Sequence, residues 1–124
     1  MERGTLGRIP YLAMGSGPPM VFVGGLSFSG GVDAAGTEKM AASMVKPFAT
    51  ERRVLFVNRR RDLPRGMTMA EMAAEHAEAI RALAAGPVDV VGVSTGGSIA
   101  QQLAADHPEA VRRLVLIGSG RRPP

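Results

Sequence analysis

The sequence predicts an α/β fold, a mostly parallel sheet with helices on both faces. Four short apolar runs rich in β-branched residues end in turn residues, as buried parallel strands do. Segments with helical spacing of apolar residues separate these runs. Of the 124 residues, 45% are hydrophobic and 21% are charged, which is typical of a globular chain of one domain. We therefore expect residues 1–124 to belong to a single domain.

The expected strands begin near the N-terminus. Residues 8–14 are expected to form one antiparallel edge strand that turns at residues 15–18. The four apolar runs are expected to form parallel strands, at residues 20–23, 54–57, 88–93 and 114–117. Because strands and helices alternate, each connection is expected to be a right-handed crossover.

Three helices are expected between the strands. The first covers about residues 37–46, and Pro47 stops or bends it. The second begins after Thr68, which forms a capping box with Glu71, and residues 86–87 end it. The third covers about residues 95–107 and ends before a proline.

Composition excludes several classes of function. The chain has no cysteine, so disulfides, thiolate nucleophiles and cysteine metal sites are excluded. The net charge is +4, and aromatic residues make up only 4% of the chain. The arginines form no single stripe but lie in separate groups, at residues 52–53, 59–61, 112–113 and 121–122. We therefore expect a solvated surface and no nucleic-acid partner. No apolar run has membrane-spanning length and no signal peptide is evident, so we expect a soluble, cytoplasmic protein without membrane contact.

The motif that carries chemistry is Gly92-Val93-Ser94-Thr95-Gly96, which fits G-x-S-x-G. It lies where an expected buried strand ends and an expected helix begins. Such a turn pushes the serine Oγ out of the sheet edge and needs small neighbours, which Gly92, Gly96 and Gly97 supply. The alternative interpretation is a serine that caps a helix in a glycine-rich turn.

Residues 88–100 and 103–117 resemble the nucleophile strand, the helix and the next strand of the α/β-hydrolase family. Residues 15–19, followed by an apolar strand, resemble that family's approach to its oxyanion loop, and the resemblance extends over about residues 8–119. It implies a serine ester or acyl hydrolase with Ser94 as nucleophile and the backbone N–H groups of Leu26 and Thr95 as oxyanion donors. It implies a small-molecule ester or acyl substrate and neither a metal nor a cofactor.

Two departures from the family pattern bear on activity. Residues 24–25 are Gly-Gly where the family has His-Gly. The family's acid and histidine follow later strands, so the resemblance implies a truncated core that is inactive or weakly active. Neither histidine is expected to replace them: His107 lies about 18 Å from Ser94 along the helix, and His76 is expected in the core.

Two other hypotheses stay open. Residues 25–31 and 58–61 could form a loose phosphate loop and an arginine grip in an NADP-binding half-domain. The chain could instead be a non-catalytic fragment or subunit. If the chain is a truncated hydrolase core, residues 114–117 form an aliphatic edge strand, through which we expect possible self-association.

Overall fold

The computed structural model of the chain describes residues 2–7, 9–24, 37–57, 66–93 and 96–118. In chain order, its strands, α-helices and two 3₁₀ helices are β1 (Glu2–Leu6), β2 (Ile9–Met14), β3 (Pro19–Val23), α1 (Thr37–Val45), η2 (Lys46–Phe48), β4 (Arg53–Val57), α2 (Met69–Leu83), β5 (Val88–Val93), α3 (Gly96–Asp106), η3 (Pro108–Ala110) and β6 (Val111–Ile117).

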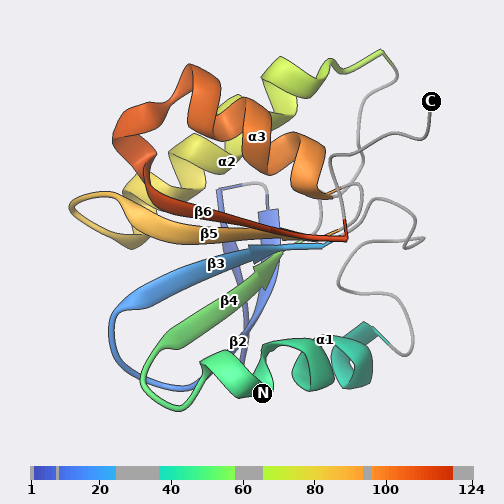
Figure 1. Cartoon of the computed structure of the whole chain (residues 1–124), viewed down its shortest axis with the longest axis vertical. Helices are drawn as coiled ribbons and strands as arrows, with labels where there is room; N and C mark the ends of the chain where they lie inside the picture. Colours follow the sequence, from blue (N-terminus) through green and yellow to red (C-terminus); the bar gives the residue numbers. More distant parts are fainter. Residues whose placement is uncertain (1, 8, 25–36, 58–65, 94–95, 119–124) are drawn as a thin grey trace.

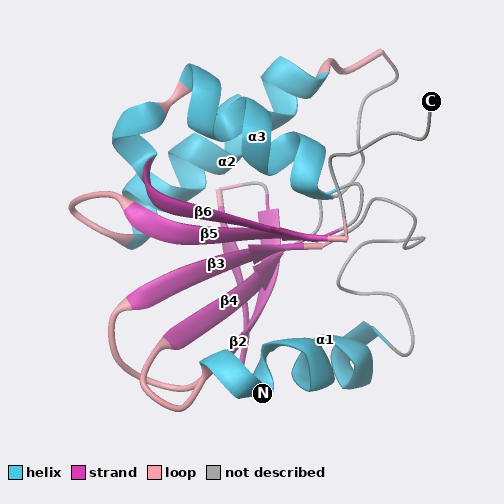
Figure 2. Ribbon diagram, viewed as in Figure 1, coloured by secondary structure: helices cyan, strands magenta, loops and turns pink. Residues whose placement is uncertain are grey.

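The described strands form one sheet in the order β1-β2-β4-β3-β5-β6. Strands β4, β3, β5 and β6 are parallel, and the β1–β2 hairpin joins antiparallel to β4. Helix α1 lies on one face of the sheet, and α2 and α3 lie on the other (Figures 1 and 2). The predicted fold class, a mostly parallel sheet with helices on both faces, is therefore confirmed.

Two apolar layers hold the helices on the sheet. Along β3, Val21 and Val23 face the layer under α2 and α3, whereas Met20 and Phe22 face the layer under α1. This alternation follows from the two-residue period of a strand. Because both sets are buried, the central strands have an almost continuous apolar sequence, which is the signal from which the sequence predicted them.

The predicted helices lie close to their expected positions. Thr68 Oγ1 accepts a hydrogen bond from the Glu71 N–H at 3.1 Å, and Glu71 Oε1 accepts one from the Thr68 N–H at 2.8 Å, so the predicted capping box is present. Pro47 lies in η2, which directly follows α1. Helix α3 ends one residue earlier than expected, at Asp106.

The expectation of one N-terminal edge strand was wrong. Strand β2 is flanked on both sides, by β4 and by β1, and β1 is the edge. Leu6 pairs with Ile9, so two residues connect β1 and β2, and Gly7 adopts a φ of 61° there. A glycine with positive φ suits such a tight hairpin loop. The sequence hides β1 because its polar residues show no apolar alternation.

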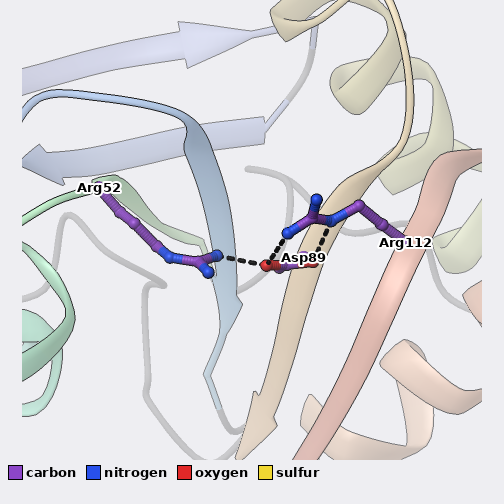
Figure 3. Close-up of polar contacts among 3 residues, drawn as sticks. All are labelled: Arg52, Asp89 and Arg112. Atoms are coloured by element: carbon purple, nitrogen blue, oxygen red, sulfur yellow. Dashed lines mark hydrogen bonds and ion pairs between the residues drawn. The ribbon is translucent and has the colours of Figure 1, made fainter.

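The sequence predicted that the arginines at residues 52–53 and 112 are solvated surface residues. That prediction was wrong, because these side chains form ion pairs with acidic residues. Asp89, at 6% exposure, accepts hydrogen bonds from Arg112 Nε at 3.0 Å and from Arg112 Nη2 at 3.3 Å, and it also pairs with Arg52 (Figure 3). Arg53 pairs with Glu2 of β1. These pairs join segments that are far apart in the sequence, so the sequence order alone does not reveal them.

Candidate functional site

The candidate site lies where β5 turns into α3. Strand β5 ends at Val93 and α3 begins at Gly96, so a two-residue connection joins strand and helix. The helix that follows β3, α1, covers one face of the sheet, and the helix that follows β5, α3, covers the other (Figure 1). Because β3 and β5 are neighbours, this edge is a topological switch point, the place where open α/β sheets bind ligands.

The backbone of α3 passes very close to β5 at Gly92. A Cβ atom added to Gly92 would lie 2.7 Å from the Gly97 Cα and 2.8 Å from the Ala100 Cβ. Non-bonded carbons normally lie about 3.5–4.0 Å apart. The turn therefore has room for glycine at position 92 and small residues at 97 and 100. The sequence indicated the glycines, and the contact at Ala100 follows from its position one helical turn beyond Gly97.

The start of α3 also contacts the end of β3. A Cβ atom on Gly96 would collide with the carbonyl oxygens of Val23 and Gly24 and would lie 2.8 Å from the Gly24 carbonyl carbon. The Gly24 N–H donates a hydrogen bond to the Val57 carbonyl oxygen at 2.8 Å. The ends of β3, β4 and α3 are thus in backbone contact at this edge.

Gly24 has a steric role that the sequence does not reveal. A Cβ atom there would lie 2.6 Å from the ring of Phe56 on β4. In the sequence, residues 24–25 stand out only as a departure from a family pattern. No local signal reveals the contact, because Phe56 approaches through the pairing of β3 with β4.

The three residues expected to do the chemistry, Ser94, Thr95 and Leu26, lie outside the described residues. So do residues 25–31 and 58–61, on which the NADP hypothesis depends. The described residues nearest in sequence to Ser94, Thr95 and Leu26 are Val93, Gly96 and Gly24. The backbones of the last two are in direct contact.

The two histidines lie on α2 and just beyond the end of α3. His76 is buried on α2, at 4% exposure, and its Nδ1–H donates a hydrogen bond to the Met72 carbonyl oxygen at 2.8 Å. Its Nε2 has no hydrogen-bond partner among the described residues, and burial lowers the pKa of its ring. His107 follows the last residue of α3, at the opposite end of that helix from Gly96. The predicted core position of His76 is confirmed.

A cavity of about 380 Å³ lies at the opposite ends of the strands, and its lining includes Arg52, Asp89 and Arg112. The two arginines share the Asp89 carboxylate, and hydrogen bonds from Arg112 and then Arg52 lower the pKa of Asp89 to about 2 in spite of its burial. We assign this cluster a structural role, because it connects the segments at the amino ends of β4, β5 and β6.

Within the described ranges, no group of three or more histidine, aspartate and glutamate side chains could hold a metal ion. Across the same ranges, no helix is both long and apolar enough to cross a membrane.

A comparison with models of protein families identifies one family for this chain. The model of the alpha/beta hydrolase fold matches residues 36–124, well over half of the chain. A comparison with curated proteins found no match.

Solved structures similar to this chain include Est816, Rv0554 and a thermophilic esterase. Est816, described as an N-acyl homoserine lactone degrading enzyme, is 27% identical with a TM-score of 0.73, over 99% of this chain and 49% of its own. Rv0554 from Mycobacterium tuberculosis is 27% identical with a TM-score of 0.68, over 98% of this chain and 46% of its own. A thermophilic esterase from Thermogutta terrifontis, 23% identical with a TM-score of 0.75 over 100% of this chain and 48% of its own, shows a similar fold.

The chain spans about half the length of these three structures.

Proposed function

Since this chain belongs to the α/β-hydrolase fold family, we propose that it carries the nucleophile and oxyanion part of a serine hydrolase site. The observation that carries the proposal is the two-residue connection between β5 and α3, where Gly92 lies tightly against α3 and Gly96 lies tightly against the end of β3. Ser94 is the first residue of that connection. A nucleophile elbow requires a sharp strand-to-helix turn of this kind.

In the proposed reaction, Ser94 Oγ attacks the carbonyl carbon of an ester and loses its proton to a base. The C–O bond of the ester then breaks, the alcohol leaves with a proton, and the acyl group stays on the serine. Water hydrolyses this acyl-enzyme and restores the hydroxyl.

The backbone N–H groups of Leu26 and Thr95 are the proposed donors to the oxyanion of the tetrahedral intermediate. Support comes from the contact between Gly24 and Gly96, because Leu26 is two residues beyond the first and Thr95 is one residue before the second. The end of β3 and the start of α3 meet at this contact, which supports the proposal that both donors serve one site. One such donor is typically worth about 10²–10³ in rate.

We propose that the 124-residue chain hydrolyses esters only weakly. Serine needs a base to become a strong nucleophile, and histidine most often supplies it. The chain has two histidines, of which His76 is buried on α2 and His107 lies beyond the far end of α3. A missing base costs about 10²–10⁴ in rate.

The proposed substrates are carboxylic esters or related acyl compounds. A serine nucleophile with an oxyanion hole suits attack on an acyl carbon. Est816, at 27% identity, is described as degrading N-acyl homoserine lactones, and a lactone is a cyclic ester. This likeness supports the ester class and does not select a particular acyl group.

The test is the hydrolysis of an activated ester, p-nitrophenyl acetate, by the 124-residue chain and two variants. Ser94→Ala removes the proposed nucleophile. Ser98→Ala is the matched control, because Ser98 lies in α3 only four residues further along and is half-buried. We expect slow hydrolysis by the wild type and by S98A, and a rate at the uncatalysed background for S94A.

Two results would contradict the proposal. One is an S94A variant that hydrolyses the ester as fast as the wild type while S98A is slower. The other is a well-folded wild type whose rate equals the background. Folding of each variant is checked by circular dichroism.

A further inference from the structure

The cavity of about 380 Å³ at the amino ends of the strands has the size of a ligand pocket. Four segments line it: residues 18–19 at the start of β3, residues 51–52 before β4, residues 84 and 86–89 between α2 and β5, and Arg112 of β6. Strands β3 and β5 are interior strands, each with a described neighbour on both sides. The cavity is therefore centred on the middle of the sheet and has room for a small organic molecule.

An irregularity in the pairing of β5 with β6 places Arg112 on the cavity wall. Val88 pairs with Val111 and the next residue, Asp89, pairs with Arg113, so Arg112 is an extra residue between the two pairs. Bulges of this kind are rare in parallel pairs, and they often direct a side chain toward a site. Arg112 uses the edge formed by its Nε and Nη2 to bind the Asp89 carboxylate, at 3.0 and 3.3 Å.

Arg52 reaches the same carboxylate in a different way. It approaches Asp89 from the side opposite to Arg112 and contacts it through Nη1 (Figure 3). The Nε and Nη2 atoms of Arg52 lie outside this ion pair. They form the edge of a guanidinium group that binds a carboxylate with two parallel hydrogen bonds. Arg52 thus keeps for another ligand the edge that Arg112 uses on Asp89.

The charges on the wall favour an anion. Arg52 and Arg112 carry two positive charges and share the single carboxylate of Asp89. Hydrogen bonds from Arg112 and then Arg52 lower the pKa of Asp89 to about 2, so this carboxylate stays ionised and only one of the two charges is compensated. Glu51 also lines the cavity, but it is exposed, so solvent and salt screen its charge.

We propose that, beside its structural role, this cluster binds a small organic carboxylate, whose two oxygens accept hydrogen bonds from Nε and Nη2 of Arg52. Arg112 supports this role because it holds Asp89 in place and shares its negative charge. A single uncompensated charge suits a monoanion better than a dianion such as phosphate. The apolar part of the ligand packs on the apolar part of the wall, which includes Pro18, Pro19, Ala84 and Pro87.

The experiment titrates the full 124-residue chain with sodium benzoate at constant ionic strength. Isothermal titration calorimetry gives the affinity, and NMR spectra of the backbone amides locate the bound molecule. Benzamide has a similar shape without the charge, so it tests whether the carboxylate is recognised. Inorganic phosphate tests the preference for a monoanion.

Three variants accompany the wild type. Arg52→Gln removes the proposed binding edge, and it should fold because Arg112 still pairs with Asp89. Glu51→Gln removes the like charge from the wall. Arg113→Gln is the matched control, because Arg113 is an exposed arginine of β6 outside the cavity lining. Thermal melts by circular dichroism verify that each protein folds.

We expect benzoate to bind the wild type and R113Q with a Kd of about 1 mM, and benzamide at least about tenfold more weakly. R52Q should weaken benzoate binding about ten- to a hundredfold, because it removes two hydrogen bonds to a charged group. E51Q should strengthen binding about twofold, because a repulsive charge is lost. The amide shifts should change most at residues 86–89 and 112.

Several results would overturn the proposal. A folded wild type that does not bind benzoate is one, and equal affinity for benzoate and benzamide is another. Benzoate binding that is unchanged in R52Q, or amide changes centred on Val93, Gly96 and Gly97, would place the molecule elsewhere. Tighter binding of phosphate than of benzoate would contradict the assignment of a monoanionic carboxylate.

Discussion

Replacement of Gly92 by alanine tests the packing that shapes the candidate site. The new Cβ atom would lie 2.7 Å from the Gly97 Cα and 2.8 Å from the Ala100 Cβ. Since carbons pack at about 3.5 Å or more, α3 would have to move away from β5 by about 0.8 Å. The start of the helix has little room to adjust, because Gly96 already touches the backbone of β3.

The magnitude follows from two opposing effects. Alanine in a strand gains about 0.5–1 kcal/mol over glycine, because it loses less backbone freedom on folding. Overpacking of a tight contact costs about 1–3 kcal/mol, and here one of the contacting atoms belongs to the backbone. We expect G92A to lose about 1–2 kcal/mol of unfolding free energy, which lowers Tm by about 3–10 °C in a domain of this size.

The assay is thermal and urea unfolding of G92A beside Gly86→Ala. A Cβ atom on Gly86 meets nothing within 4 Å, so G86A should be as stable as the wild type or slightly more stable. Hydrolysis of p-nitrophenyl acetate by folded G92A should also fall, because the proposed nucleophile lies two residues beyond the displaced position. If G92A is as stable and as active as G86A, the close approach of α3 to β5 is not what shapes this turn.

Three further predictions concern stability. Hydrogen bonds from Arg112 and Arg52 lower the pKa of Asp89 from 3.8 to about 2. The wild type should therefore lose about 2 kcal/mol of stability between about pH 4 and pH 2 in urea titrations, and D89N should not show this loss. Burial lowers the pKa of His76 below 6.5. Below about pH 6.5, protonation of the unfolded chain should therefore destabilise the wild type by at most about 1.4 kcal/mol per pH unit. If the unfolding free energy of H76L falls with pH as steeply as that of the wild type, this prediction is refuted. Thr68→Ala removes the hydrogen bond to the Glu71 N–H and should cost about 1 kcal/mol in thermal melts, whereas a cost near zero would mean that the cap contributes nothing.

Much of the fold could be predicted from the sequence because its signals are local. The apolar runs of β3, β4 and β5 are buried on both faces and therefore read as strands without reference to the rest of the chain. The capping box at Thr68 and Glu71 marks the start of α2 within four residues.

What the sequence did not predict depends on contacts between distant residues. Strand β1 is held by its pairing with β2 and by the ion pair of Glu2 with Arg53, 51 positions away. Asp89 binds Arg112 across a separation of 23 positions. Such partners are set by sheet order and register, so the arginine pairs look like ordinary surface residues in the sequence.

The candidate site also combines features that are local in the sequence with contacts between distant residues. The G-x-S-x-G spacing is local, so the sequence pointed to Gly92 and Gly96 directly. The contacts that require glycine at position 96 are not local, because Gly96 meets Val23 of β3 and the following residue, Gly24. The steric role of Gly24 against Phe56 has the same origin.

The most direct test of the proposed nucleophile is to find where an acyl group is attached. The chain is mixed briefly with p-nitrophenyl acetate, quenched in acid, digested and examined by peptide mass spectrometry. We expect the acetyl group on the peptide that contains Ser94, assigned to that residue by fragmentation, and its absence in S94A but not in S98A. Two results would contradict the assignment of Ser94 as the nucleophile. One is acetylation at another residue, together with an S94A variant that hydrolyses the ester as fast as the wild type. The other is an S94A variant that still carries the acetyl group on this peptide.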